Sequence, residues 1–246
     1  MALANTWRLS SVERASMTEQ VLRELREAII EGRIPQGEPL REVSLAATLG
    51  TGRSAVREAV RQLVQEGLVD YEPHRGAFVR TMSLADRLDV YVAREAIEVG
   101  AARRILDAPP ADLADLRAAF DDLTKTAFDE DRITQPVIDA DIRFHQHLVR
   151  LAASPRLVRA HETLAAETRM LLRHHPAYPW STYVTDHVRL LEAVESRDPA
   201  TPDLVAEHLR LSKDLIASEL AHAEGEAPAM TPTAPRPDRP EAGRVV

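Results

Sequence analysis

Apolar residues recur at helical spacing from the start of the chain's first ordered segment. Val21 and Leu22 are followed three or four residues later by Leu25 and then by Ile29, and Gly32 follows the run. This spacing is typical of an amphipathic helix, and glycine is a common residue after a helix end. Similar patterns predict a second helix over 40–49 and a third from about 53 to 66, separated by Gly50-Thr51-Gly52. The pattern therefore predicts three short helices.

The residues after the third helix predict a β-hairpin. Leu68 to Tyr71 and Ala77 to Arg80 form short runs with β-formers, and Pro73-His74-Arg75-Gly76 supplies turn residues between them. Three helices followed by a hairpin make a winged helix-turn-helix, which we assign to residues 13–80 after a flexible arm at 1–12. The predicted function of such a module is DNA binding.

The rest of the chain predicts an all-α domain. After a linker at 81–83, residues 84–222 show helical patterns broken by proline and short polar stretches. The predicted helices span 84–106, 110–127, 131–153, 155–174, 181–196 and 202–221. Residues 223–246 are rich in proline and alanine, so we expect a disordered tail. The predicted fold class is mainly α, with a C-terminal bundle of six to seven helices.

Composition narrows the class of protein. Aromatic residues make up only 4% of the chain against 44% hydrophobic residues, which favours packed helices. The chain has no cysteine, which excludes disulfides and thiolate metal sites and fits a cytoplasmic protein. Without a signal peptide or an apolar run near the ~20 residues of a membrane span, we expect no membrane partner. We expect association with the nucleoid when the protein is bound to DNA.

Charge alone argues weakly against a nucleic-acid partner. The net charge is −8, and residues 1–80 hold 11 arginines and 11 acidic residues. The local arrangement is more informative. On the third predicted helix, Val56, Val60 and Leu63 share an apolar face. The polar side of that helix and the hairpin tip carry the candidate DNA-binding residues Arg53, Ser54, Arg57, Arg61, Arg75 and Gly76.

Arginine suits this position because its fork can bond guanine O6 and N7 together. A single arginine on a helix face is more often simply solvated, but the glycine break and the basic hairpin tip favour DNA reading. The stretch LREVSLAATLGTGRSAVREAVRQLVQEGLVDYEPHRGAFV closely resembles the GntR-family winged helix-turn-helix. The resemblance implies that Arg53, Ser54, Arg57 and Gly76 contact operator DNA.

The sequence also departs from the GntR pattern. Gly52 occupies the usual Ser or Thr helix cap, so we expect capping to fall to Thr51. Ala55 stands where proline is frequent, and Val43 stands where some members have arginine. One phosphate or base contact is therefore expected to be missing.

Polar residues on apolar faces are the second informative feature. Asp141 and His145 lie within the apolar face of 137–152, and His187 and His208 lie on the apolar faces of two later helices. Such residues are costly to bury unless they are paired or bound to metal. Hydrogen-bonded core histidines and a shared metal site both remain open from periodicity alone. We interpret the other histidines as surface or loop residues: His74, His147, His161, His174, His175 and His222.

A second resemblance covers residues 84–222. An R-x-x-x-E helix, D-x-x-x-H, DH-x-x-LLEAV and a final EHL are similar to the FCD ligand-binding domain of the FadR subfamily. The resemblance implies one divalent metal per chain, held by Asp141, His145, His187 and His208, with zinc expected and nickel, manganese or iron as alternatives. Ala153-Ser154-Pro155 stands where Gly-Asn-Pro is common, which is expected to alter the pocket wall.

The FCD resemblance also places Arg94 at an effector pocket, where it can clamp a carboxylate. The alternative is an Arg94 that lies at the surface or pairs with Glu98. Taken together, the sequence predicts a transcriptional regulator, expected to be a repressor, that binds a palindromic double-stranded operator as a homodimer. A small organic acid is the expected effector.

Two rival functions use the same residues. One is a metal-dependent enzyme, but no separate inward acid is well placed as a general base, so we predict that the chain is not an enzyme. The other is a regulator in which the metal is structural or is itself the signal.

Overall fold

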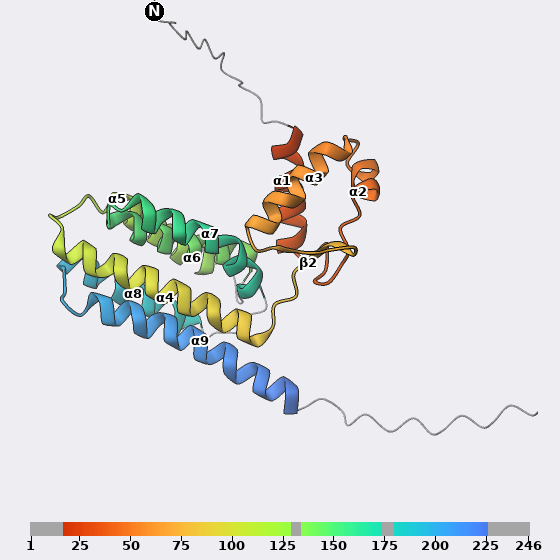
Figure 1. The fold of residues 1–246 in the computed structure, drawn as a ribbon. Coiled ribbons are helices and arrows are strands. Elements are labelled where there is room, and N and C mark those ends of the chain that lie inside the picture. Colours follow the sequence, from red (N-terminus) through yellow and green to blue (C-terminus); the bar gives the residue numbers. More distant parts are fainter. Residues whose placement is uncertain (1–16, 129–133, 174–179, 226–246) are drawn as a thin grey trace, which may run out of the picture.

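A computed structural model describes residues 17–128, 134–173 and 180–225 of the chain. It is mainly helical and has two parts, which we call the head (17–80) and the body (84–225) (Figure 1). The mainly α fold class with an N-terminal winged helix-turn-helix is confirmed. The predicted arm at 1–12 lies outside the described residues, as does most of the predicted tail.

The head is built from three helices and a hairpin. Its helices are α1 (Met17–Ile30), α2 (Glu42–Thr48) and α3 (Arg53–Gln65). Strands β1 (Val69–Glu72) and β2 (Gly76–Val79) pair antiparallel, and each differs from its predicted bounds by one residue at both ends. Val56 and Leu63 are fully buried, as the apolar face predicted. The hairpin is therefore fixed to the same core that positions α3.

The start of α3 differs from the prediction. Gly52 is the N-cap residue, and no side chain makes a capping hydrogen bond there. Thr51 does not cap α3, and its backbone N–H donates to Ala46 O at the end of α2. The expectation that Thr51 takes over the cap is therefore wrong.

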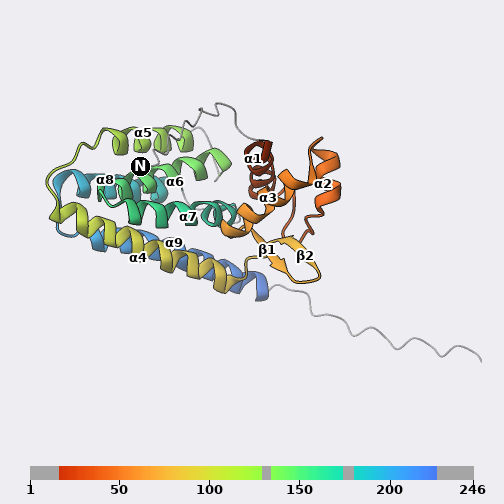
Figure 2. The same ribbon diagram turned by 45° about the horizontal axis from the view of Figure 1, so that its top comes forward.

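Six described helices form the body: α4 (Leu84–Asp107), α5 (Ala114–Phe128), α6 (Gln135–Leu151), α7 (Pro155–Leu172), α8 (Trp180–Ser196) and α9 (Thr201–Gly225). The long helices α4 and α9 run side by side, and α6 packs against α4, α5 and α7 (Figure 2). Helix α9 continues to Gly225, into the predicted tail. The body thus places α6 among three neighbouring helices.

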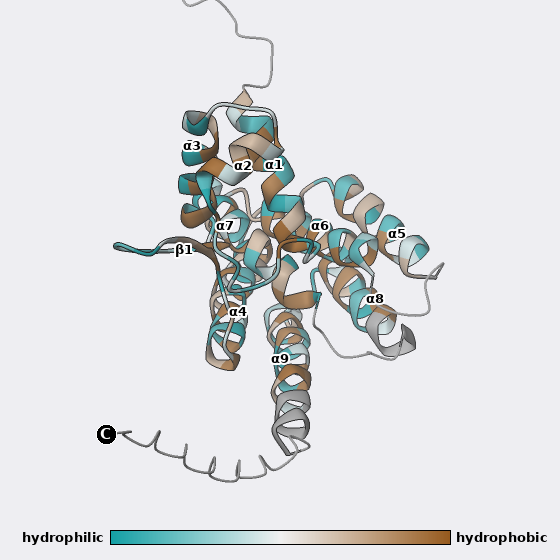
Figure 3. Cartoon of the chain, turned by 90° about the vertical axis from the view of Figure 1, so that its right-hand side faces the viewer, coloured by the Kyte–Doolittle hydropathy of each residue, from teal (hydrophilic) through white to brown (hydrophobic). Residues whose placement is uncertain are grey.

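Local signals set where the body helices begin. A capping box between Ser83 and Asp86 starts α4, directly after the predicted linker. Helix α5 begins at Ala114 rather than 110, because the Asp112 side chain accepts a hydrogen bond of 2.9 Å from Ala114 N. Hydrophilic and hydrophobic residues alternate along the helices (Figure 3). No described helix is long and apolar enough to cross a membrane.

The connection between α6 and α7 contains a residue in a left-handed conformation. Ala153 has φ 47°, at the position where the FCD pattern commonly has glycine. A Cβ in this region costs roughly 1–2 kcal/mol. The substitution Ala153→Gly should therefore raise the free energy of unfolding by about 1 kcal/mol after allowing for the greater freedom of glycine in the unfolded chain. Urea denaturation followed by circular dichroism measures this change.

The neighbouring residue supplies a control of opposite sign. Ala152 has an ordinary φ of −67° and is buried. Ala152→Gly should lower the free energy of unfolding by about 1 kcal/mol. If both variants are destabilised, the strain at Ala153 does not limit stability.

Candidate metal centre and DNA-reading surface

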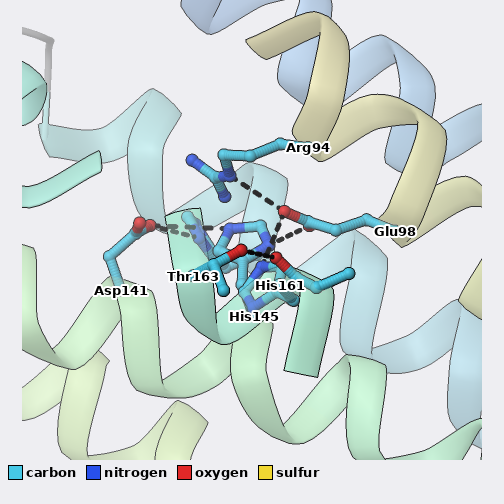
Figure 4. Close-up of polar contacts among 8 residues, drawn as sticks. Arg94, Glu98, Asp141, His145, His161 and Thr163 are labelled. Carbon is cyan, nitrogen blue, oxygen red and sulfur yellow. Dashed lines mark hydrogen bonds and ion pairs between the residues drawn. The ribbon is translucent and has the colours of Figure 1, made fainter. Parts of the chain in front are cut away.

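Polar side chains from five helices meet inside the body. Arg94 and Glu98 come from α4, Asp141 and His145 from α6, and His161 from α7, and all five are buried (Figure 4). His187 from α8 and His208 from α9 are buried as well. The amphipathic helices carry these residues on their inner faces, so helix packing brings together residues far apart in sequence.

The three histidines predicted as ligands lie close together. His145, His187 and His208 each offer a ring nitrogen, and these nitrogens lie within 4.8 Å of one another. Asp141 borders the group, with Oδ1 at 3.0 Å from His187 Nε2 and 3.7 Å from His145 Nε2. The structure therefore gathers all four residues that the sequence singled out, with Asp141 in contact with two of the three imidazoles.

Glu98 lies behind this group and joins three of the buried polar residues. It accepts hydrogen bonds from Arg94 Nε at 2.9 Å and contacts His145 Nδ1 at 2.6 Å and His161 Nε2 at 3.1 Å. The sequence indicated Glu98 only as a partner for Arg94. A carboxylate on the far nitrogen of a histidine fixes the ring and leaves its other nitrogen facing inward.

The prediction that His161 lies at the surface is wrong. Its side chain is 4% exposed. A signal for this was present, because His161, Ala165, Thr168 and Leu172 recur at helical spacing and all are buried. Two of these residues are small or polar, so the face does not stand out by hydrophobicity.

Arg94 is 3% exposed and paired with Glu98. The alternative of a surface arginine is therefore wrong, and the alternative of pairing with Glu98 describes what the structure shows. The pair uses Nε, and the terminal nitrogens point away from Glu98 (Figure 4). The guanidinium also lies 5.5 Å from the centre of the Tyr91 ring.

Burial and the neighbouring charged or hydrogen-bonding groups shift the carboxyl pKa values of this cluster in opposite directions. Burial raises the pKa of Glu98, but Arg94 and the histidine hydrogen bonds outweigh it and hold that pKa well below its usual value. For Asp141, burial is likewise outweighed, chiefly by His145 and His187, so its pKa is also lowered. Burial lowers the pKa of His145 and His208, which keeps both imidazoles neutral at physiological pH. Neutral imidazole and ionised carboxylate are the forms that bind metals.

The donor set fits a divalent metal. His145 Nε2 and His208 Nδ1 are buried without a hydrogen-bond partner, a state that costs about 1–3 kcal/mol per group. With histidine counted as uncharged, as in the formal net charge of the chain, Arg94, Glu98 and Asp141 give the described cluster a formal charge of −1. Both the unpartnered nitrogens and the excess negative charge favour a bound cation.

The predicted DNA-binding residues lie at the surface of the head. Arg53, Ser54, Arg57, Arg61 and Arg75 are exposed, and Gly76 is partly exposed at the start of β2. Three of the arginines pair with glutamates. Arg57 donates to both Glu42 oxygens at 2.8–3.1 Å, Arg61 lies 3.5 Å from Glu58, and Arg75 pairs with Glu72.

The arginines near Glu42 stabilise its ionised carboxylate. The hydrogen bonds from Arg57 lower the pKa of Glu42, and Arg53 and Arg61 add to the effect. The carboxylate therefore stays ionised and holds the Arg57 fork in place on the exposed side of α3.

Comparison with known proteins matches both parts of the chain. Residues 17–79 match the model of bacterial regulatory proteins of the gntR family, and residues 89–211 match the FCD domain. A probable D-xylose utilization operon transcriptional repressor of Paenarthrobacter nicotinovorans is 32% identical over 181 residues, 73% of this chain and 77% of that protein. A transcriptional regulator of Streptomyces ambofaciens is 32% identical over 205 residues, 81% of this chain and 84% of that protein.

A solved structure of a GntR regulator also matches this chain. A GntR transcriptional regulator from Rhodococcus sp. RHA1 is 27% identical, with a TM-score of 0.59, and the match covers 86% of this chain and 97% of that one. These proteins are regulators, so the enzyme alternative is not supported. The chain belongs to the GntR family of bacterial transcriptional regulators, as a member that carries an FCD domain.

Proposed function

We propose that the chain is a repressor whose operator affinity is controlled by a small carboxylate bound at a metal centre in the body. The observation that carries this proposal is the buried group of His145, His187 and His208 beside Asp141, in which His145 Nε2 and His208 Nδ1 have no hydrogen-bond partner. These four residues would hold one divalent metal per chain. Zinc suits three imidazoles and a carboxylate, and nickel, manganese and iron are alternatives.

The chain's own residues prepare this centre. Glu98 keeps the His145 proton on Nδ1, so the Nε2 lone pair faces the other imidazoles. Arg94 and Glu98 neutralise each other next to the centre. When bound, the metal supplies positive charge and open coordination positions for an oxygen ligand.

Charge favours an anionic effector. Adding a divalent cation to a cluster of formal charge −1 leaves it at +1, which one carboxylate would neutralise. The terminal nitrogens of Arg94, which point away from Glu98 (Figure 4), are suited to bind that carboxylate. Since one relative is named as a repressor of D-xylose utilization, sugars and sugar acids belong in a first panel of effectors.

In the head, Arg53, Ser54, Arg57, Arg61, Arg75 and Gly76 form the proposed DNA-reading surface. Their glutamate partners would give way to guanine edges and phosphates when DNA binds. A homodimer would place two such heads on a palindromic operator. The effector would act by binding one arrangement of the heads more tightly than the other.

Removal of the metal tests the centre. A chelator should lower the melting temperature of the purified protein, and added Zn²⁺ should restore it, because a ligand that binds only the folded state stabilises it. Native mass spectrometry should find one metal per chain in the parent and a loss of metal in His187→Ala and His208→Ala. His147→Ala, which alters a partly exposed histidine beside His145, should keep its metal. Full metal occupancy in both ligand variants would exclude this coordination set.

Screening of organic acids tests the effector. In the metal-loaded protein, at least one sugar acid or other small carboxylate should raise the melting temperature and change operator affinity. In Arg94→Lys, which keeps the charge but loses the fork, that acid should bind about tenfold more weakly or worse, while metal content stays unchanged. If metal alone changes operator affinity and no acid adds to it, the protein is a metal-responsive regulator instead.

Substitution of the recognition helix tests DNA reading. Arg57→Ala should weaken binding to the operator beside the protein's own gene by about ten- to a hundredfold, since one bidentate base contact is lost. Arg33→Ala is a matched control, because Arg33 is also in the head, is also 50% exposed and also pairs with glutamates. Footprinting and fluorescence anisotropy measure both. Equal affinities for the two variants would remove Arg57 from the reading surface.

A further inference from the structure

Helix α7 takes part in the buried polar cluster through one residue. His161 Nε2 lies 3.1 Å from Glu98 Oε1, and Glu98 Oε2 lies 2.6 Å from His145 Nδ1. Arg94 Nε donates to the same oxygen, Oε1, that holds His161. A shift of His145 or Arg94 would therefore move the carboxylate on which His161 depends.

The C-terminal half of the same helix contacts the head. Glu167 Oε1 pairs with Arg80 Nη1 at 2.9 Å, just after the hairpin. Its carboxylate also lies against Gly67, where an added methyl group would collide with it. Gly67 follows the C-cap residue of α3, so α7 contacts the chain just beyond the helix that carries the proposed DNA-reading residues.

Arg173 makes a second contact, directly after α7. Its Nη1 donates to Ile30 O at 3.3 Å, and its guanidinium lies against Gly32. Ile30 is the last residue of α1, where backbone carbonyls lack helical partners and a cation is favourable. The two head glycines that follow α1 and α3 thus both accommodate side chains from α7 or its C-cap.

Placing the Glu167 carboxylate between head and body costs desolvation energy. Partial burial raises the pKa of Glu167, although Arg80 opposes this effect. An apolar residue beside Gly67 would bury its side chain without the desolvation cost of a charge. The ion pair therefore favours one defined orientation of the head on the body, which nonspecific apolar packing would not.

We propose that α7 couples the metal centre to the head, with His161 and Glu98 linking the centre to the helix, and Glu167 and Arg173 linking the helix to the ends of α3 and α1. This coupling rests on the proposed metal centre. His161 and Glu167 are six positions apart, which is about 9 Å along the helix, and a packed helix moves as a rigid element. Movement at the centre would therefore reach the head as a displacement of its two helix ends.

Hydrogen exchange of the full chain, with and without Zn²⁺, tests this coupling. In the parent, Zn²⁺ should slow exchange in α6 and α8, which reports loading, and change it by about fivefold in residues 28–34 and 64–68 of the head, the lower end of typical coupling. Glu167→Gln should keep the response of α6 and α8 but lose that of 64–68. Arg173→Gln should instead lose the response of 28–34.

Two further variants separate coupling from general damage. Glu162→Gln is a matched control, because Glu162 is also on α7 but pairs with Arg150, within the body. In this variant, Zn²⁺ should change hydrogen exchange in both body and head as it does in the parent. Arg80→Gln breaks the Glu167 pair from the other side and should reproduce Glu167→Gln, which keeps the test valid if either variant is unstable.

The outcomes are distinguishable. If Zn²⁺ still changes hydrogen exchange in residues 28–34 and 64–68 of Glu167→Gln, Arg80→Gln and Arg173→Gln, the proposed coupling is overturned and the metal centre stands. An absence of any Zn²⁺ effect in α6 and α8 of the parent would overturn the metal centre, and the coupling with it.

Discussion

The body keeps two carboxylates and a guanidinium away from water, and the arrangement of its helices depends on balancing those charges. Glu98 and Arg94 are nearly inaccessible, as is Asp141. Isolated charges in such a place would be very costly. The surrounding histidines reduce the cost by hydrogen bonding to the carboxylates. Since the partners come from several different helices, a change in one helix alters the electrostatic balance of the others.

This balance restricts the relative positions of the body helices more tightly than hydrophobic packing alone would. Apolar contacts tolerate small sliding movements, whereas a hydrogen-bonded carboxylate shared by three groups has a narrow range of positions. Glu98 imposes that restriction on α4, α6 and α7 together. The head is joined to the body through charged contacts with defined geometry as well, so α7 is constrained by polar groups at His161 and Glu167 in addition to its apolar packing.

Much of the fold and part of the site could be predicted from the sequence. The helices and hairpin follow from apolar spacing and glycine breaks, and Asp141, His145, His187 and His208 stood out because they interrupt strongly apolar faces. His161 was missed because its face is made of small and polar residues, and the contacts of Glu98 depend on helices that are distant in sequence. The cap of α3 was mispredicted because Gly52 itself occupies the N-cap position, while Thr51 belongs to the end of α2. Pairing across a fold is set by tertiary packing, which no local pattern contains.

The chain order of the buried histidines also has a consequence during synthesis. A ribosome-bound chain that has emerged only through α6 carries Asp141 and His145 but lacks His187, and His208 arrives last, on α9. A truncated product would lack part of the donor set even if its head were folded. If the proposed metal centre receives the signal, a fragment that has lost α9 would lack His208 and with it part of the receiving site, so its DNA binding would no longer depend on the effector.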